Sequence, residues 1–360
     1  MSKPNKLYVI NDVVYPDTDG GKKIVLGRIL KDAESFNVNV LIYNYTSNET
    51  DKLTEFFRKK SIDFTIVEKK VSKARRILSI FSLIPFYAEV FFSDVAFFTA
   101  LNDVLGKERY DFVCFETIWF YKVFKKIKLN KDLKVSFLFH NVESKFFEEL
   151  SKSSHVLLYK AFYYFESLKV LSLEKKMSMA RGISYVFLSR SDLLEYNRKG
   201  LFKTTENLIN HNDIYIEKKL DRSNVGQYFL FPGSLSFPPN YYAIDRFLKV
   251  YESSNLDYPV YITGTKLFED EFKKYSKARF TGFLVNDDLI GMYSKCTAVL
   301  SPITTGSGVK VKNIESVLLG VPLVATKFSM IGIEYDVCSD VVVTENEMTD
   351  FVTKLEKKFL

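Results

Sequence analysis

The sequence predicts an α/β protein built from two doubly wound domains. Short runs of β-branched and aromatic residues alternate with longer helical patterns along almost the whole chain, an order that favours parallel sheets with right-handed crossovers. The alternation restarts after a polar stretch, residues 212–227, and the chain of 360 residues exceeds the size of most single cores. We therefore expect a first domain over residues 1–220, a second over 221–345, and a C-terminal helix over 346–360 that could pack back on the first domain.

The strands are predicted from short apolar runs that end in polar or glycine-containing loops. In the first domain they cover residues 6–11, 38–43, 63–67, 111–115, 134–139 and 183–188, and the longest helix runs from about 154 to 180. In the second domain they cover residues 228–233, 258–264, 278–282, 297–301, 321–325 and 340–344, and a last helix follows. Doubly wound sheets bind ligands at the carboxyl ends of their strands, and two such domains facing one another would form a cleft. The loops after strands are therefore the places to search for a site.

Composition narrows the class of protein. With 47% hydrophobic and 26% charged residues, the chain has the composition of a folded globular protein. Its first residues contain no apolar stretch long enough for a signal peptide, which predicts a cytoplasmic protein. Cys114, Cys296 and Cys338 are odd in number, far apart and inside apolar runs. We expect them to be free core thiols, since neither disulfide nor zinc spacing is present.

Positive charge gathers in front of an apolar, aromatic segment. Eight Lys and Arg residues lie between Arg58 and Arg76, and the apolar run covers residues 77–98. A proline and two acidic residues interrupt that run, which makes it a poor transmembrane span. Residues 58–98 could instead rest on an anionic membrane surface, although a solvated surface explains the charge equally well. Nucleic acid is not expected, because no DNA- or RNA-binding motif accompanies the charge.

The loop after the first predicted strand contains two features. Gly20 and Gly21 precede a helix, and such a turn lets the backbone approach a phosphate or a sugar closely, although a tight turn without a ligand is the alternative. Asp17 and Asp19 form an Asp-x-Asp pattern that could hold a divalent cation against a diphosphate. The same two acids serve equally well as turn and N-cap residues, so we expect no bound metal.

Two further loops carry candidate site residues. His140 stands where the fifth predicted strand ends and a helix begins, the usual place for a working side chain in this architecture. Gly233 and Ser234 form the first strand-to-loop turn of the second domain, where their backbone donors could meet a phosphate. His140 is the candidate catalytic residue, and the Gly233-Ser234 turn is a weaker signal.

The most informative segment is PITTGSGVKVKNIESVLLGVP, residues 302–322. A Walker-type phosphate loop is excluded because no Gly-Lys-Ser/Thr ending is present, and a dinucleotide fingerprint is excluded because the third glycine is absent. What remains is a Gly-x-Gly turn followed by Lys310, Lys312 and Glu315. Ammonium groups suit a pyrophosphate, and a carboxylate can accept hydrogen bonds from ribose hydroxyls. The pattern favours a nucleotide-sugar site over a surface loop and an amphipathic helix.

These segments together resemble glycosyltransferase family 4, the group 1 glycosyltransferases. SPITTGSGVKVKNIESVLLGVPLVAT is similar to the family's donor-binding motif in its Gly-x-Gly-x-(Lys/Arg)-x-Lys variant. LFPGSLSFPPNYYAIDRFL resembles the start of its second domain, and FTGFLVNDDLIGMYSKCTAVLSP resembles a following strand, helix and strand. HNVES and PDTDGG resemble its two N-terminal loops. The resemblance implies the GT-B fold and a retaining transfer from a sugar nucleotide, with no bound metal and no other cofactor.

The resemblance also implies roles for single residues. Glu315 matches the glutamate that binds the nucleotide ribose, and Lys310 and Lys312 match the basic pair that faces the diphosphate. The glycine pair at 20–21 matches the N-terminal glycine loop near the phosphate and the donor sugar. His140 matches the histidine that lines the acceptor side of the reaction centre, where it would polarise or position the donor sugar.

One position departs from the family pattern. Many members carry a glutamate eight residues before the ribose glutamate, and this chain has Ser307 there. We expect backbone amides of Ser307 and Gly308 to do part of its work, and the donor sugar stays open. The sequence thus predicts a retaining glycosyltransferase that moves a sugar to a lipid-linked, polysaccharide or glycoconjugate acceptor. A GT-B sugar-nucleotide epimerase and an inactive glycosyltransferase-like subunit are the alternatives.

Overall fold

The chain forms two compact units, residues 1–215 and 216–360, and each is described here by itself. The division falls close to the boundary near residue 220 that the polar stretch suggested. The computed structural model describes residues 3–15, 20–44, 50–68, 73–92, 95–127, 130, 132–154, 156–202, 208–209, 213–216, 220–264, 268–306, 308–333 and 340–360.

The first unit is built on a six-stranded parallel sheet with the order β3-β2-β1-β4-β5-β6. Its strands are β1 (Asn5–Asn11), β2 (Asn37–Asn44), β3 (Asp63–Glu68), β4 (Phe112–Phe115), β5 (Lys134–Phe139) and β6 (Ile183–Phe187). This is the doubly wound order, in which strands are added first toward one edge of the sheet, from β1 to β3, and then toward the other, from β4 to β6. A ligand is therefore expected at the carboxyl ends of β1 and β4.

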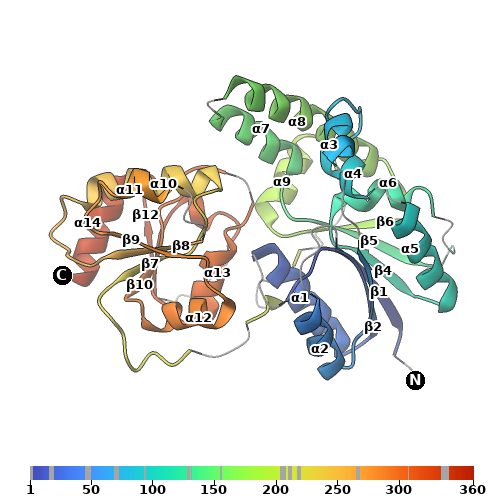
Figure 1. Ribbon diagram of the computed structural model, residues 1–360, viewed down its shortest axis with the longest axis horizontal. Helices are drawn as coiled ribbons and strands as arrows, with labels where there is room; N and C mark the ends of the chain where they lie inside the picture. Colours follow the sequence, from blue (N-terminus) through green and yellow to red (C-terminus); the bar gives the residue numbers. More distant parts are fainter. Residues whose placement is uncertain are drawn as a thin grey trace. The chain divides into compact units, whose positions relative to one another are not determined.

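Helices cover both faces of this sheet (Figure 1). They are α1 (Gly20–Ala33), α2 (Asp51–Lys59), α3 (Lys73–Ile80), α4 (Phe86–Phe92), α5 (Val95–Lys107), the 3-10 helix η1 (Ile118–Phe120), α6 (Tyr121–Phe124), α7 (Glu143–Ser153), α8 (Leu157–Ser178) and α9 (Arg190–Arg198). The long helix α8 corresponds to the predicted one and packs antiparallel to α7 as a hairpin.

The second unit repeats the same plan. Its parallel sheet has the order β12-β11-β10-β7-β8-β9, so the switch between the two directions lies between β7 and β10. The strands are β7 (Phe229–Phe231), β8 (Val260–Thr263), β9 (Ala278–Gly282), β10 (Ala298–Ser301), β11 (Leu323–Thr326) and β12 (Val341–Thr344). The helices are α10 (Pro238–Tyr251), α11 (Glu269–Phe272), α12 (Asn286–Lys295), α13 (Val311–Leu318), η3 (Phe328–Met330) and α14 (Met348–Phe359). All strands in both units coincide with predicted ones, which confirms the predicted fold class.

The C-terminal helix α14 belongs to the second unit. It packs on α10, β11 and β12, and its Phe351 and Leu355 side chains are fully buried in the core of that unit. Its apolar residues recur at helical spacing and cover one face of the sheet. The segment 346–360 is therefore a layer of the second domain and not the separate element that we expected.

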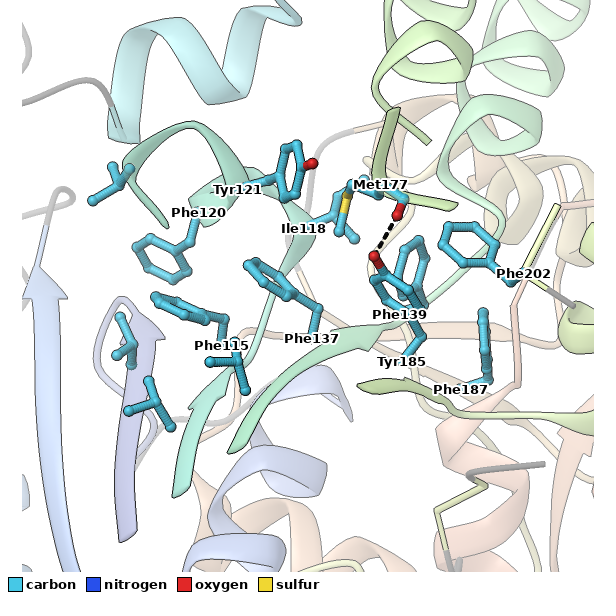
Figure 2. Packing of buried hydrophobic residues seen from close by; sticks show 14 of the residues in the cluster. Phe115, Ile118, Phe120, Tyr121, Phe137, Phe139, Met177, Tyr185, Phe187 and Phe202 are labelled. Carbon is cyan, nitrogen blue, oxygen red and sulfur yellow. Dashed lines mark hydrogen bonds between the residues drawn. The ribbon is translucent and has the colours of Figure 1, made fainter. Parts of the chain in front are cut away.

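Aromatic side chains dominate the core of the first unit. Figure 2 shows Phe115 stacked on Phe137 and Phe139 beside Phe187, with ring centres 4.7 and 5.2 Å apart. Phe115 and Phe139 are the last residues of β4 and β5 and are fully buried. Rings of this size fix a strand end firmly because each buries a large apolar area. The residues that follow them, Glu116 and His140, thus start from rigid positions.

The expected apolar segment, residues 77–98, is divided between α3, α4 and α5. Ala88 and Phe97 are buried in the first unit, whereas Ile77, Leu78 and Phe81 are exposed. Within the part of the chain that the structure describes, no helix is long and apolar enough to span a membrane. Among the cysteines, Cys114 and Cys296 are buried free thiols as predicted, and Cys338 lies outside the described residues.

Candidate active site

The first unit has a pocket of about 280 Å³ at its topological switch point. The end of β1, the start of α1, the loop after β4 and the loop after β5 supply its walls. The lining residues are Ile10, Asn11, Asp12, Val14, Gly21, Lys22, Val25, Thr117, Trp119, His140 and Glu143. This is the crevice in which doubly wound sheets bind their ligands. The structure therefore brings Gly21 and His140 to one pocket, with Gly20 directly beside them as the first residue of α1.

Asp12 and Lys22 join the two sides of the glycine loop. Asp12 has a backbone φ of 66°. One carboxylate oxygen accepts from the Val13 N–H at 2.9 Å, and the other lies 3.1 Å from Lys22 Nζ. The sequence analysis did not identify this pair, although a polar residue directly after a buried strand is a signal that could have done so.

A buried ion pair lies next to His140, between Arg28 and Glu116. Arg28 on α1 contacts both carboxylate oxygens of Glu116 at 2.5 Å, and only 1% of the Glu116 side chain is exposed. Burial raises the pKa of Glu116, and the Arg28 charge opposes that rise. The Glu116 carbonyl oxygen accepts from His140 Nε2 at 2.9 Å. Because a carbonyl can only accept, the imidazole carries a proton on Nε2, and its ring orientation is fixed by β4.

Glu143 is a further titratable group in the pocket that the sequence analysis did not identify. It is the first residue of α7 and is 9% exposed. Burial, together with the charges of Glu174 and Asp192, raises the pKa of Glu143 to about 8. Glu174 in turn accepts from the Ser144 N–H at 3.0 Å and from the Tyr196 hydroxyl at 2.6 Å. A carboxyl group that is protonated near neutral pH can donate a hydrogen bond to a ligand oxygen.

In the second unit, the predicted residues Gly233, Ser234 and Lys312 meet around Asn240. The Asn240 amide donates to the Ser234 carbonyl oxygen at 3.0 Å and accepts from Lys312 Nζ at 3.3 Å. A side chain on Gly233 would come within 2.8 Å of the Asn240 amide nitrogen and 3.3 Å of Lys312 Nζ. A glycine is required there for this close approach. The β7 loop and α13 thus form one site at the second switch point.

The two predicted lysines differ in environment. Lys310 precedes α13, and its Nζ donates to the Gly308 carbonyl oxygen at 2.8 Å. Lys312 Nζ lies 4.1 Å from the centre of the buried Phe231 ring. Burial and the neighbouring Lys310 charge lower the pKa of Lys312 to about 7. An anion at the N-terminus of α13 would supply the negative charge that these two ammonium groups require.

Glu315 lies one helical turn beyond Lys312 on α13 and is 7% exposed. The hydroxyl of the buried Tyr293 on α12 donates to its carboxylate at 3.5 Å. Nearby, the Asn313 amide donates to the Ser329 carbonyl oxygen at 2.9 Å and ties α13 to η3. The Tyr293 hydroxyl thus contributes to the orientation of the Glu315 carboxylate, which a group that binds a diol requires. Tyr293 had no signal in the sequence, because its position depends on the packing of α12 against α13.

Three predicted positions cannot be placed. Asp17 and Asp19, the alternative metal ligands, and Ser307, the departure from the family pattern, lie outside the described residues. Their roles stay predictions. The Gly-x-Gly turn is described at Gly306 and Gly308, with φ values of 97° and 71° that favour glycine.

Residues 226–358 match the family described as glycosyl transferases group 1. This range covers nearly the whole second unit, including Lys310, Lys312 and Glu315. Two parallel doubly wound sheets are the architecture of GT-B glycosyltransferases, and solved structures of that fold match nearly the full chain. The chain thus has the GT-B fold, and its second unit matches the group 1 glycosyltransferase family.

Particular relatives are distant. The chain is 24% identical over 359 residues to an uncharacterized 44.6 kDa protein in the cps region of Klebsiella pneumoniae, covering 95% of this chain and 88% of the relative. Sucrose-phosphate synthase from Thermosynechococcus elongatus has a similar structure, with a TM-score of 0.66 and 11% identity over 98% of this chain and 89% of that one. HepE from Anabaena in complex with UDP-glucose gives a TM-score of 0.61 and 12% identity, with the same coverage.

Proposed function

We propose that this protein moves a sugar from a nucleotide-sugar donor to a lipid-linked, polysaccharide or other glycoconjugate acceptor, with retention of configuration at the anomeric carbon. The main support is the meeting of Gly233, Asn240 and Lys312 at the switch point of the second sheet. This site lies within the range that matches the group 1 family. HepE, which has a similar fold, binds UDP-glucose, so a uridine diphosphate sugar is the first donor to test.

The second unit would hold the donor. Lys310, Lys312 and the N–H groups that begin α13 would bind the diphosphate and stabilise the charge that develops on it as the sugar departs. Glu315, oriented by Tyr293, would accept hydrogen bonds from the ribose hydroxyls. The turn at Gly233 and Ser234, which lies against Asn240 and Lys312, would border the phosphates. The second unit would thus act on the donor through charges and hydrogen bonds alone, without a protein nucleophile.

The pocket of the first unit would hold the reacting hydroxyl of the acceptor. His140 has its Nε2 proton committed to the Glu116 carbonyl oxygen, so its ring is presented in one orientation. Glu143 would donate a hydrogen bond from its protonated carboxyl group, and Asp12 and Lys22 would fix further hydroxyls. Trp119 offers an apolar wall against which a sugar ring can stack. We propose His140 as the residue that positions the reacting sugar.

Two measurements test this proposal. Calorimetry with UDP, GDP, ADP and CMP sugars should show binding of one nucleotide class, and the Lys312→Gln variant should lose that binding. Its thermal unfolding temperature without ligand should not fall, because the buried Lys312 ammonium group is unfavourable in the folded state. Trp119 is the only tryptophan of the chain and lines the pocket of the first unit. Its fluorescence should therefore respond to the acceptor but not to inorganic pyrophosphate.

Product analysis separates the alternatives. Incubation with the donor alone should leave the nucleotide sugar unchanged or slowly hydrolysed, whereas an epimerase would convert it to a new nucleotide sugar. If the wild-type protein binds no donor, the alternative of an inactive glycosyltransferase-like subunit is favoured. We also propose that transfer needs no metal, so EDTA should leave the rate unchanged. A rate that falls with EDTA and recovers with Mg²⁺ or Mn²⁺ would point to Asp17 and Asp19 instead.

A further inference from the structure

The first unit exposes a group of large apolar side chains that the two candidate sites do not use. It is formed by α3, the turn after it and the first half of α8, and we call it the α3–α8 surface. Its exposed residues are Ile77, Leu78, Phe81, Leu83, Val156, Leu157, Leu158, Tyr159, Tyr164, Phe165 and Leu168. Leu83, Phe81, Leu157 and Leu158 are 93%, 82%, 80% and 75% exposed. Side chains of this size are rarely left so open in a group.

Hydrogen bonds hold the two parts of this surface together. Lys169 on α8 donates to the Ile80 carbonyl oxygen at 3.0 Å, and the Glu166 carboxylate accepts from the Phe86 N–H at 2.7 Å. Lys169 and Glu166 also form an ion pair at 2.6 Å. Figure 1 shows α3 beside the α7–α8 hairpin at one end of the unit. The exposed apolar residues of α8 begin at its first turn and extend along it for about 17 Å.

Most residues of both parts lie in segments that contain basic but no acidic residues. The sequence contains no acidic residue between Glu68 and Glu89, where five Lys and Arg residues occur, and none between Glu149 and Glu166, where two lysines occur. Among the described side chains, Arg76, Lys152 and Lys160 are exposed within these segments, and Lys152 pairs with Glu148 at 2.5 Å. Protein interfaces are depleted in lysine, whereas anionic membrane surfaces attract basic residues beside exposed Leu, Phe and Tyr. The charge therefore selects a lipid surface over a protein partner.

We propose that the α3–α8 surface docks the protein on an anionic lipid bilayer. The apolar side chains enter the interfacial region, the tyrosines lie at the headgroup level, and Arg76 and Lys160 face the lipid phosphates. The proposal replaces the expectation that residues 58–98 rest on an anionic membrane surface with a smaller surface that includes α8. Arg58 to Lys60 lie at the end of α2, which is at the opposite end of the unit from α3 (Figure 1), and Ala88 and Phe97 are buried. Half of the surface comes from α8 instead.

Vesicle co-sedimentation of the full chain tests the proposal without a donor or an acceptor, so it does not depend on the transferase activity. The protein should bind phosphatidylcholine vesicles that contain phosphatidylglycerol, and it should bind pure phosphatidylcholine several-fold more weakly. The Leu157→Ser/Leu158→Ser and Phe81→Ser/Leu83→Ser variants should each bind these vesicles at least about tenfold more weakly than the wild type. All four residues are exposed, so thermal unfolding should be unchanged.

Two controls sharpen the result. Met179 caps the opposite end of α8 and is 73% exposed, and Met179→Ser should bind vesicles as the wild type does. The Arg76→Glu/Lys160→Glu variant should lose the preference for anionic lipid. Added salt should likewise weaken the binding of the wild-type protein to anionic vesicles. Absence of vesicle binding at low salt would overturn the proposal. So would a dimer in sedimentation velocity that the leucine variants break, because the surface would then serve a second copy.

Discussion

The Lys312 ammonium group lies 4.1 Å from the centre of the Phe231 ring and 3.3 Å from the Asn240 amide oxygen. Burial lowers the pKa of Lys312 to about 7, and the like charge of Lys310 lowers it in the same direction. Near neutral pH, Lys312 is therefore half neutral before the donor arrives. A diphosphate would restore its proton, which links donor affinity to pH.

The first prediction is that donor binding takes up a proton. A nucleotide sugar has no titrating phosphate near neutral pH, so uptake at pH 8 reports Lys312. Calorimetry in buffers of different ionisation enthalpy should give close to one proton, and affinity should fall by up to about tenfold per pH unit above pH 7. Lys312→Arg keeps its charge at every pH and should show neither effect. Equal proton uptake by the arginine variant would exclude this assignment.

The lowered pKa of Lys312 also determines how the free energy of unfolding changes with pH. The folded pKa of Lys312 lies below its ordinary value of 10.5. Between about pH 7 and 10.5, the unfolded chain binds a proton that the folded chain does not, so this group makes stability rise with pH across that window. In denaturant titrations at pH 7 and pH 9, Lys312→Met should lose this contribution and should be the less pH-dependent protein.

The second prediction separates the ribose from the diphosphate. Glu315→Gln should weaken binding of a nucleoside diphosphate by about ten- to a hundredfold, since a charged hydrogen bond is lost at each ribose hydroxyl. It should leave inorganic pyrophosphate binding unchanged, because pyrophosphate has no ribose. Lys312→Gln should weaken both ligands. Tyr293→Phe, which removes only the hydroxyl that orients Glu315, should lie between Glu315→Gln and the wild type.

The third prediction concerns Glu143, whose pKa burial raises to about 8. Between pH 4.5 and 8, the folded protein holds a proton that the unfolded chain releases, so stability should fall as pH rises, by up to about 1.4 kcal/mol per pH unit. The charged groups that face Glu143 are Glu174 on α8 and Asp192 on α9. Glu143→Gln mimics the protonated form, and its free energy of unfolding should change less between pH 5 and pH 8.

Activity gives a second readout for Glu143. If its protonated carboxyl group donates to the acceptor, Glu143→Gln should keep most of the transfer rate and extend it above pH 8, where the wild type declines. Glu143→Ala should raise KM for the acceptor without changing donor affinity. A fall in donor affinity in either variant would contradict the placement of Glu143 at the acceptor.

The fourth prediction concerns the packing of α1, the helix that begins with the glycine pair at 20–21. A methyl group on Gly27 would lie 1.8 Å from the Asp213 carbonyl oxygen and 2.8 Å from the Tyr215 nitrogen. Backbone cannot yield easily, so Gly27→Ala should lower the free energy of unfolding by about 1–3 kcal/mol. Gly106→Ala is the matched control in helix α5, where an added methyl meets nothing within 4 Å. It should raise stability by about 0.5–1 kcal/mol in the same denaturant titration.

The sequence could locate the strands and the loops after them because both signals are local. The run KLYVIN predicts β1 from its apolar residues alone, and the glycines and lysines of residues 302–322 exclude two nucleotide motifs by their spacing. His140 was found because it directly follows a strand. Each of these inferences uses residues within about ten positions of one another.

The sequence by itself thus determined two α/β domains, the position of the donor loop and the chemical types of its side chains. Only the tertiary structure decided the strand order, and with it which loops meet. Asn240 beside Lys312, Arg28 beside Glu116, and α8 beside α3 each join segments that are distant along the chain. Such contacts depend on how whole elements pack against a sheet, and no local period of the sequence records that packing.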